Sequence, residues 1–153
     1  GIAFGWAGVA AYLALAAYAQ VQLLLSDYVQ HYGLTRAPGA NGKLAPIGPG
    51  HSWNAGEGFT ARLMLNAPYH SDHHTHPSRR YQSLRHYDDL PELPNGYFGV
   101  YLLAYVPWLW FRVMDKRLLA LPHVQGDLGR VNIDPAAREQ LISRYGTAEP
   151  ADS

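Results

Sequence analysis

The sequence predicts a mainly α-helical chain that is embedded in a membrane and carries a histidine-rich metal site. Three observations support this fold class: an uncharged apolar N-terminal stretch, a second apolar and aromatic stretch near residue 100, and a cluster of six of the eight histidines between residues 51 and 86. The 153 residues include 12 basic and 12 acidic side chains, so no net charge favours nucleic acid as a partner. The absence of cysteine excludes disulfide frameworks and thiolate-bound metals.

The N-terminal stretch is long enough to cross a bilayer. No charged residue precedes Asp27, and residues 2–25 are almost wholly apolar. A transmembrane helix needs about 20 such residues to cross roughly 30 Å of hydrocarbon. The alternative is a buried helix of a soluble all-α protein, for which an uncharged stretch of this length is unusual. We therefore predict a transmembrane helix within residues 1–34. Arg36 and Lys43 follow it, and basic residues of this kind favour a cytoplasmic location for its C-terminal end.

The rest of the chain changes composition twice. It divides into a Gly/Pro-rich connection, a histidine and aromatic region, and a polar C-terminal tail, over residues 35–58, 59–121 and 122–153. In the tail, Asp134 followed by a proline predicts the start of a surface helix, which we expect to end at Gly146. All of these parts are expected to belong to one domain.

The second apolar stretch, Tyr97 to Phe111, is uncharged, and seven of its fifteen residues are aromatic. It is short for a transmembrane helix and contains Pro107. Aromatic rings of this density are typical of segments at the membrane interface. An aromatic core helix remains the alternative.

The chemistry is expected at the histidines. His70, His73 and His74 have the i, i+3, i+4 spacing that places three imidazoles on one face of a helix. Imidazole nitrogens bind zinc, copper, iron and nickel, and three from one helical turn leave positions open for water, O2 or substrate. Asp72 lies between them and is a candidate acceptor for the second ring nitrogen of a ligand. His76 precedes a proline, where the helix must end, and is less suited to the same face.

His31 is a separate candidate. It follows the apolar stretch directly, two residues before Gly33, which is a plausible helix terminus. Taken alone, a single histidine there is more often a packing residue than a metal ligand.

Three segments together resemble a known enzyme family. The sequences DYVQHYGL, HSWN and HSDHHTHPSRRYQSLRHYDDLPELPNGY, at residues 27–34, 51–54 and 70–97, are similar to the C-terminal half of the integral-membrane alkane 1-monooxygenases. That family belongs to the histidine-rich, non-haem di-iron group that also contains xylene monooxygenases and membrane fatty-acid desaturases. The resemblance implies the C-terminal fragment of a desaturase-like helical bundle.

The resemblance also implies the activity, which is hydroxylation of the terminal methyl of alkanes to primary alcohols with O2 at a centre of two iron ions. Its implied partners are a hydrocarbon substrate, O2, a rubredoxin-type electron donor and the lipid bilayer, with the histidine-rich region on the cytoplasmic side of the inner membrane. The implied metal ligands in this chain are His31, His70, His73 and His74. We expect no catalytic group beyond these ligands, and supporting contacts from Asp27, Asp72 and His76.

The two upstream histidine boxes of the family do not occur in this sequence. We therefore expect them to precede Gly1, and we expect the segment alone to be inactive and poorly stable. Three arginines close to the histidine cluster are a candidate docking face for an acidic electron carrier: Arg79, Arg80 and Arg85. Two other functions remain open at this point, namely a desaturase or hydroxylase of another lipid in the same group, and a non-enzymatic membrane metal-binding protein.

Overall fold

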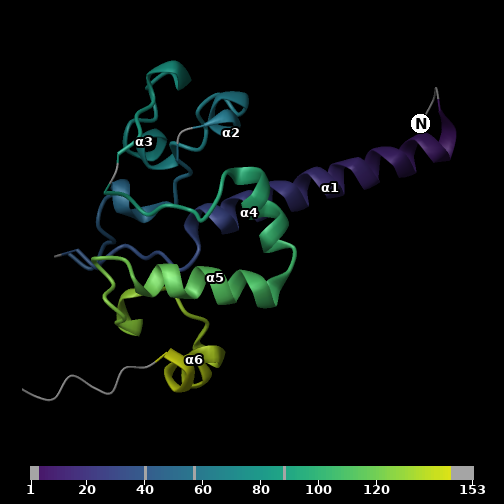
Figure 1. The fold of residues 1–153 in the computed structure, drawn as a ribbon. Coiled ribbons are helices and arrows are strands. Elements are labelled where there is room, and N and C mark those ends of the chain that lie inside the picture. The colour runs from purple at the N-terminus through teal and green to yellow at the C-terminus, as the bar shows by residue number, and fades with distance from the viewer. Residues whose placement is uncertain (1–3, 40, 57, 88, 146–153) are drawn as a thin grey trace, which may run out of the picture.

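A computed structural model gives the fold of the chain (Figure 1) and describes residues 4–39, 41–56, 58–87 and 89–145. The α-helices are α1 (Gly5–His31), α2 (Phe59–Leu63), α3 (His70–Thr75), α4 (Tyr97–Ala104), α5 (Pro107–Leu119) and α6 (Arg138–Tyr145). The described residues also form the short 3-10 helices η1 (Pro49–His51), η2 (Tyr81–Ser83), η3 (Leu128–Arg130) and η4 (Pro135–Ala137). In the described part of the chain, extended pairing is limited to two isolated bridges, so the predicted mainly α class is confirmed.

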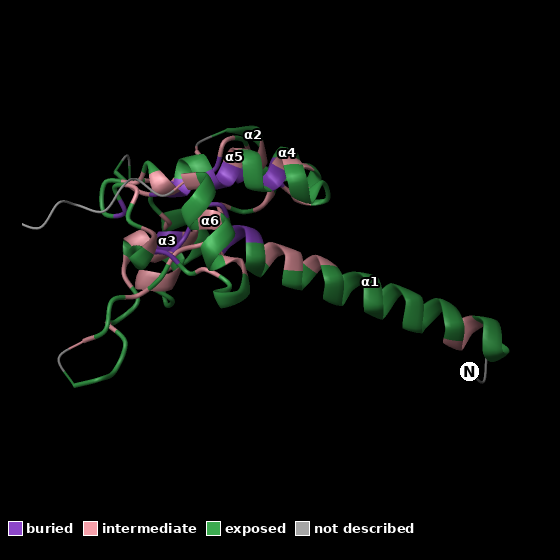
Figure 2. Cartoon of the chain, turned by 90° about the horizontal axis from the view of Figure 1, so that it is seen from below, coloured by how far each residue is buried: buried purple, intermediate pink, exposed green. Residues whose placement is uncertain are grey.

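Helix α1 projects from a body made by the shorter helices, and most of its length is exposed (Figure 2). Its 27 residues extend about 40 Å, enough for the hydrocarbon layer of a bilayer. Its buried residues are Val29 and Gln30, both in the last turn, while Leu13 and Leu15 are 59% and 69% exposed. Described residues of this chain therefore leave most of α1 uncovered, which favours the membrane segment over the core helix.

The C-terminal end of α1 is fixed by a close turn. Helical geometry stops at His31, and Gly33 adopts a left-handed φ of +69°. The left-handed φ favours glycine there, and a Cβ at Gly33 would also lie 2.1 Å from Cδ2 of Leu118 in α5, which would have to move. The prediction of Gly33 as the helix terminus is confirmed.

Helix α4 runs antiparallel to the end of α1 and is joined to it by a ladder of side-chain hydrogen bonds. Residues four apart on α1 meet residues four apart on α4, as expected when one face of each helix meets the other. The three pairs are Gln30 with Tyr97 at 3.0 Å, Ser26 with Tyr101 at 2.8 Å, and Gln22 with Tyr105. The polar groups near the end of the apolar helix are thus paired with tyrosine hydroxyls.

A hydrophobic core forms where α1, α4 and α5 meet. Helix α5 contributes Trp110, Met114 and Leu118, spaced by four residues so that they share one face. Val29 of α1 and Val100 of α4 complete the centre, and both are fully buried. The aromatic stretch therefore folds as two helices, α4 and α5, that separate at Val106 because Pro107 begins the second.

The connection after α1 returns to the helix end as an extended segment. The Trp53 amide donates to the Gln30 carbonyl at 2.7 Å, and the Trp53 indole donates to the Tyr32 carbonyl at 2.8 Å. The next amide, that of Asn54, donates to the Pro91 carbonyl at 2.8 Å. Residues 52–55 are buried and lie between α1, α3 and residues 91–93.

The polar tail contains the helix that its sequence predicts. The Asp134 carboxylate accepts a hydrogen bond from the Ala136 amide at 2.9 Å, which confirms Asp134 as the capping residue. The first turn is the 3-10 helix η4, and α6 continues from it to Tyr145. The expected end at Gly146 lies outside the described residues.

We predict that Tyr97→Phe lowers the stability of the full-length protein. The Tyr97 ring is fully buried, and removal of its hydroxyl leaves the buried Gln30 amide without this acceptor. The expected loss is about 1–2 kcal/mol, measured as an earlier unfolding transition in detergent. Tyr81→Phe is the matched control, because Tyr81 is 45% exposed, and it should leave the transition unchanged. Equal transitions for both variants would contradict the prediction.

Candidate metal centre

Three histidines from two distant helices converge on one point. His31 is the last residue of α1, whereas His70 and His74 lie one turn apart on α3. The Nε2 atom of His74 is 2.8 Å from that of His70 and 3.3 Å from that of His31. The candidate ligand atoms of all three side chains lie within 4.8 Å of one another, and all three side chains are half-buried.

The donor set suits a transition-metal ion. Two nitrogens bound about 2.1 Å from one ion at a right angle are about 3 Å apart, which is close to the two measured distances. Burial, followed by the neighbouring His74, His31 and His73, lowers the pKa of His70 to about 3. Burial and neighbouring histidines also lower the pKa of His74. Both imidazoles are therefore neutral near pH 7, with a lone pair available to a metal.

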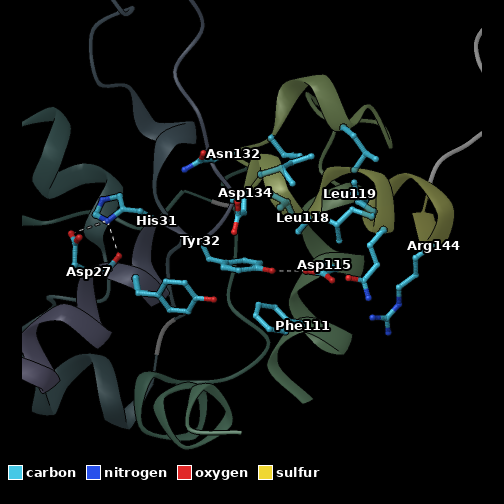
Figure 3. Close-up of a pocket in the computed structure, with 18 residues that line it drawn as sticks. Asp27, His31, Tyr32, Phe111, Asp115, Leu118, Leu119, Asn132, Asp134 and Arg144 are labelled. Atoms are coloured by element: carbon cyan, nitrogen blue, oxygen red, sulfur yellow. Dashed lines mark hydrogen bonds and ion pairs between the residues drawn. The ribbon is translucent and has the colours of Figure 1, made fainter. Parts of the chain in front are cut away.

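The orientation of His31 is set within α1. Its Nδ1 atom lies 3.0 Å from the Asp27 carbonyl oxygen and 3.3 Å from the Asp27 carboxylate, one turn earlier (Figure 3). An Nδ1–H that donates to Asp27 leaves Nε2 as the free donor atom, facing His74. Asp27 is thus placed where the sequence suggested a supporting contact.

His73 lies beside this group. Its ring centroid is 6.3 Å from that of His70 and 6.0 Å from that of His74, and the side chain is exposed. Because successive residues of an α-helix are about 100° apart, His73 and His74 project to opposite sides of His70. The structure therefore brings together three of the four candidate ligands and leaves the fourth adjacent to them.

Asp72 organises the segment that follows α3. Its buried carboxylate accepts two hydrogen bonds from the Arg79 guanidinium, at 2.6 and 2.7 Å, and one from the Arg85 amide at 2.9 Å. His76 Nδ1 and the Tyr87 hydroxyl also contact this carboxylate, at 3.0 and 3.2 Å. Burial acts to raise the pKa of Asp72, but these hydrogen bonds outweigh it and lower the pKa. The carboxylate thus contacts His76 and the segment after it, rather than a histidine of the converging group.

Helix α3 is positioned by contacts that sequence reasoning missed. The Asn54 side chain donates to Ser71 Oγ at 2.7 Å and accepts from the Ser71 amide at 3.0 Å. Ser71 Oγ also donates to the Ser52 carbonyl at 3.2 Å, and all three residues are buried. The available signal was the HSWN segment, which was noted for its resemblance but given no role.

A cavity of about 670 Å³ adjoins His31 on the side facing α5 and α6 (Figure 3). Within it, the Tyr32 hydroxyl donates to Asp115 of α5 at 2.5 Å. Burial, together with the Asp115 carboxylate, raises the pKa of Tyr32. Neither Tyr32 nor Asp115 was singled out from the sequence, because 83 residues separate them.

Comparison with known proteins identifies the class. A family model described as fatty acid desaturase matches residues 1–102, which is most of the chain, so the chain belongs to that family. It is 39% identical over 144 residues to alkane 1-monooxygenase of Acinetobacter baylyi, covering 94% of this chain and 35% of that protein. It is 44% identical over 120 residues to alkane 1-monooxygenase 1 of Pseudomonas aeruginosa, covering 78% and 31%.

A more distant relative is the xylene/toluene monooxygenase hydroxylase component of Pseudomonas putida, 32% identical over 90 residues, covering 59% of this chain and 23% of that protein. The chain spans about a third of the length of its alkane 1-monooxygenase relatives. The resemblance noted in the sequence is confirmed, and family membership together with α1 identifies the chain as part of a membrane protein.

We predict that Asp72→Ala loosens the segment after α3 in the full-length protein. The variant removes the buried carboxylate that joins α3 to Arg79 and Arg85. We expect a drop in unfolding midpoint of about 5 °C and faster proteolysis within residues 76–87. The exposed Asp89 supplies the matched control, since Asp89→Ala should behave as the parent. Unchanged proteolysis in Asp72→Ala would refute this role.

Proposed function

We propose that the protein of which this chain is part hydroxylates the terminal methyl of alkanes to primary alcohols, using O2 at a centre of two iron ions. His31, His70, His73 and His74 are the ligands in this chain, and the remaining ligands come from outside it. The observation that carries the proposal is the convergence of His31 with His70 and His74 in a chain 39–44% identical to proteins named alkane 1-monooxygenase.

The iron ions, when bound, supply the activation of O2 and the electron transfer that imidazole side chains cannot provide. The chain supplies neutral nitrogen donors, and Asp27 holds the His31 ring with Nε2 toward His74. His73 is suited to the second ion, because it lies next to the other three and projects to a different side of α3. The hydrogen bonds of Asn54 to Ser71 hold α3, and hence His70 and His74, in register with α1.

An apolar substrate fits a site at the end of a membrane helix. Each CH2 group kept out of water stabilises the bound hydrocarbon by about 0.8 kcal/mol. Access from the bilayer along α1 therefore avoids transfer of the alkane through water. We place the protein in the inner membrane with the histidines on the cytoplasmic side, because Arg36 and Lys43 follow α1.

We propose a rubredoxin-type donor as the source of the two electrons that each turnover requires. The candidate docking face for this donor contains fewer available arginines than the three considered from the sequence. Arg79 is engaged by the buried Asp72, whereas Arg80 and Arg85 have exposed side chains. Arg80 and Arg85 are therefore the residues of this group available to an acidic carrier.

The xylene/toluene relative supports a second candidate substrate, the methyl group of an aromatic hydrocarbon. The alkane is favoured because its relatives are more similar and cover more of the chain. We expect the full-length enzyme to convert octane to 1-octanol, with the hydroxyl oxygen derived from labelled O2, in gas chromatography with mass detection. Oxidation of p-xylene without oxidation of octane would favour the second candidate.

We predict that His31→Ala, His70→Ala and His74→Ala each remove most of the iron from the full-length protein. The three ligand atoms lie within 4.8 Å of one another, so each loss opens the same centre. Alkane hydroxylation should fall by at least about 100-fold, because the loss of a mere hydrogen-bonding partner of a metal ligand already costs about 10–100-fold. Iron is measured by elemental analysis of the purified, folded protein, and activity by product formation.

His123→Ala is the matched control, because His123 is exposed and lies outside the converging group. This variant should keep parental iron content and activity. Full iron content in any of the three ligand variants would overturn the proposed metal centre. If the parent protein contained iron but formed no alkane product, the proposed metal centre would stand and the proposed activity would be overturned.

A further inference from the structure

Helices α4 and α5 form a hairpin whose tip points along α1, away from the metal centre (Figure 1). The base of α4 contacts α1 at Gln30, next to the metal-site histidine, and Tyr105 near the tip contacts α1 at Gln22. Eight helical residues separate the two contacts on α1, which is a distance of about 12 Å. The tip therefore reaches about 12 Å further toward the N-terminal end of α1 than the metal site does.

The surface around the tip is apolar and exposed. Residues 93–111 contain no Lys, Arg, Asp or Glu. Leu102 is 70% exposed and Trp108 is 67% exposed, although a large apolar side chain in water is unfavourable. The neighbouring part of α1, before Asp27, is likewise uncharged and exposed. The hairpin and the membrane helix thus present one continuous apolar surface.

The backbone at the tip makes most of its hydrogen bonds within the hairpin. Pro107 has no amide hydrogen, so the turn contains one donor fewer. Four neighbouring amides donate within the hairpin: Tyr105 to the Tyr101 carbonyl at 3.2 Å, Val106 to Leu103 at 3.0 Å, and Leu109 and Trp110 to Val106 at 3.0 Å. In hydrocarbon, such internal pairing is required. The Trp108 amide, in the first turn of α5, has no acceptor among the described residues.

The base of the hairpin carries charges suited to lipid headgroups. Arg112, Lys116 and Arg117 of α5 are exposed, and Arg112 lies five residues, or about 7.5 Å, from Pro107. Long basic side chains at this depth extend to the phosphate level, while their aliphatic parts stay among acyl chains. Charge therefore limits how deeply α5 can enter.

We propose that α4 and α5 form a re-entrant hairpin, which inserts its tip into the acyl chains of the leaflet nearest the metal centre and does not cross the bilayer. The insertion is about 10 Å deep. This depth lies between the reach of the tip along α1, which is about 12 Å, and the distance of Arg112 from Pro107, which is about 7.5 Å. The ladder of Gln22, Ser26 and Gln30 with the α4 tyrosines anchors the hairpin to the membrane helix. The proposal rests on α1 as the membrane segment and is independent of the reaction catalysed.

The test measures the lipid contact of single residues in the full-length protein. Single cysteines replace Leu102 and Trp108 at the tip, Leu13 on α1, and Gln140 on α6, all exposed positions, in a background without other cysteines. Each is labelled with bimane and reconstituted into phosphatidylcholine vesicles, with and without bromine on the acyl chains. We expect bromolipid to quench Leu102→Cys and Trp108→Cys as it quenches Leu13→Cys, and iodide in the buffer to quench Gln140→Cys alone.

Two results would overturn the proposal. Iodide quenching at the tip would place the hairpin in water, and absence of quenching by both reagents would show that protein covers it. Labels at exposed positions leave packing intact, and retention of parental iron in each variant verifies the fold. If the protein did not hydroxylate alkanes but bromolipid still quenched the labels at the tip, the proposed activity would be refuted and the proposal of the hairpin would stand.

Discussion

The candidate metal site depends on the hydrogen bonds by which one short extended segment joins two helices. Trp53 is bonded through its amide to Gln30 and through its indole to Tyr32, on either side of His31. The next residue, Asn54, makes two hydrogen bonds to Ser71, the residue after His70. Since His31 and His70 are 39 positions apart in the sequence, this segment is what brings their imidazoles together. Burial strengthens these bonds, because water cannot replace them.

A second constraint holds the exit from α3. A helix of six residues has little stability of its own, so its geometry must come from tertiary contacts. The buried Asp72 carboxylate provides them at the C-terminal side, and Asn54 provides them at the N-terminal side. His70 and His74 lie between these two anchors. The two candidate ligands therefore need no regular secondary structure beyond one turn, provided that both anchors remain intact.

The sequence predicted those features that depend on local pattern. Residue type and spacing were sufficient for the helical class, the apolar helix, its end at Gly33 and the cap at Asp134, because each is decided within a few residues. The i, i+4 relation of His70 and His74 is local in the same sense, whereas the meeting of His31 with His74 across 43 positions came only from resemblance. The contacts of Asp72 with Arg79 and Tyr87, and of Tyr32 with Asp115, depend on the route of the chain in space and have no periodic signal.

The polar side chains within α1 join the membrane helix to the candidate metal site. In hydrocarbon, Gln22 and Ser26 have no water to form hydrogen bonds with, and an unpaired polar side chain there is unfavourable. An arrangement that gives each of them a partner within the protein is therefore stabilised. Tyr105, which caps α4, and Tyr101 within α4 supply those partners. The same ladder ends at Gln30, whose carbonyl accepts from Trp53. Gln30 therefore joins α4, through Tyr97, to the segment that holds α3, and it is the residue next to His31. The hydrogen bonds that make α1 compatible with its surroundings thus also help to fix the position of His31, a candidate metal ligand.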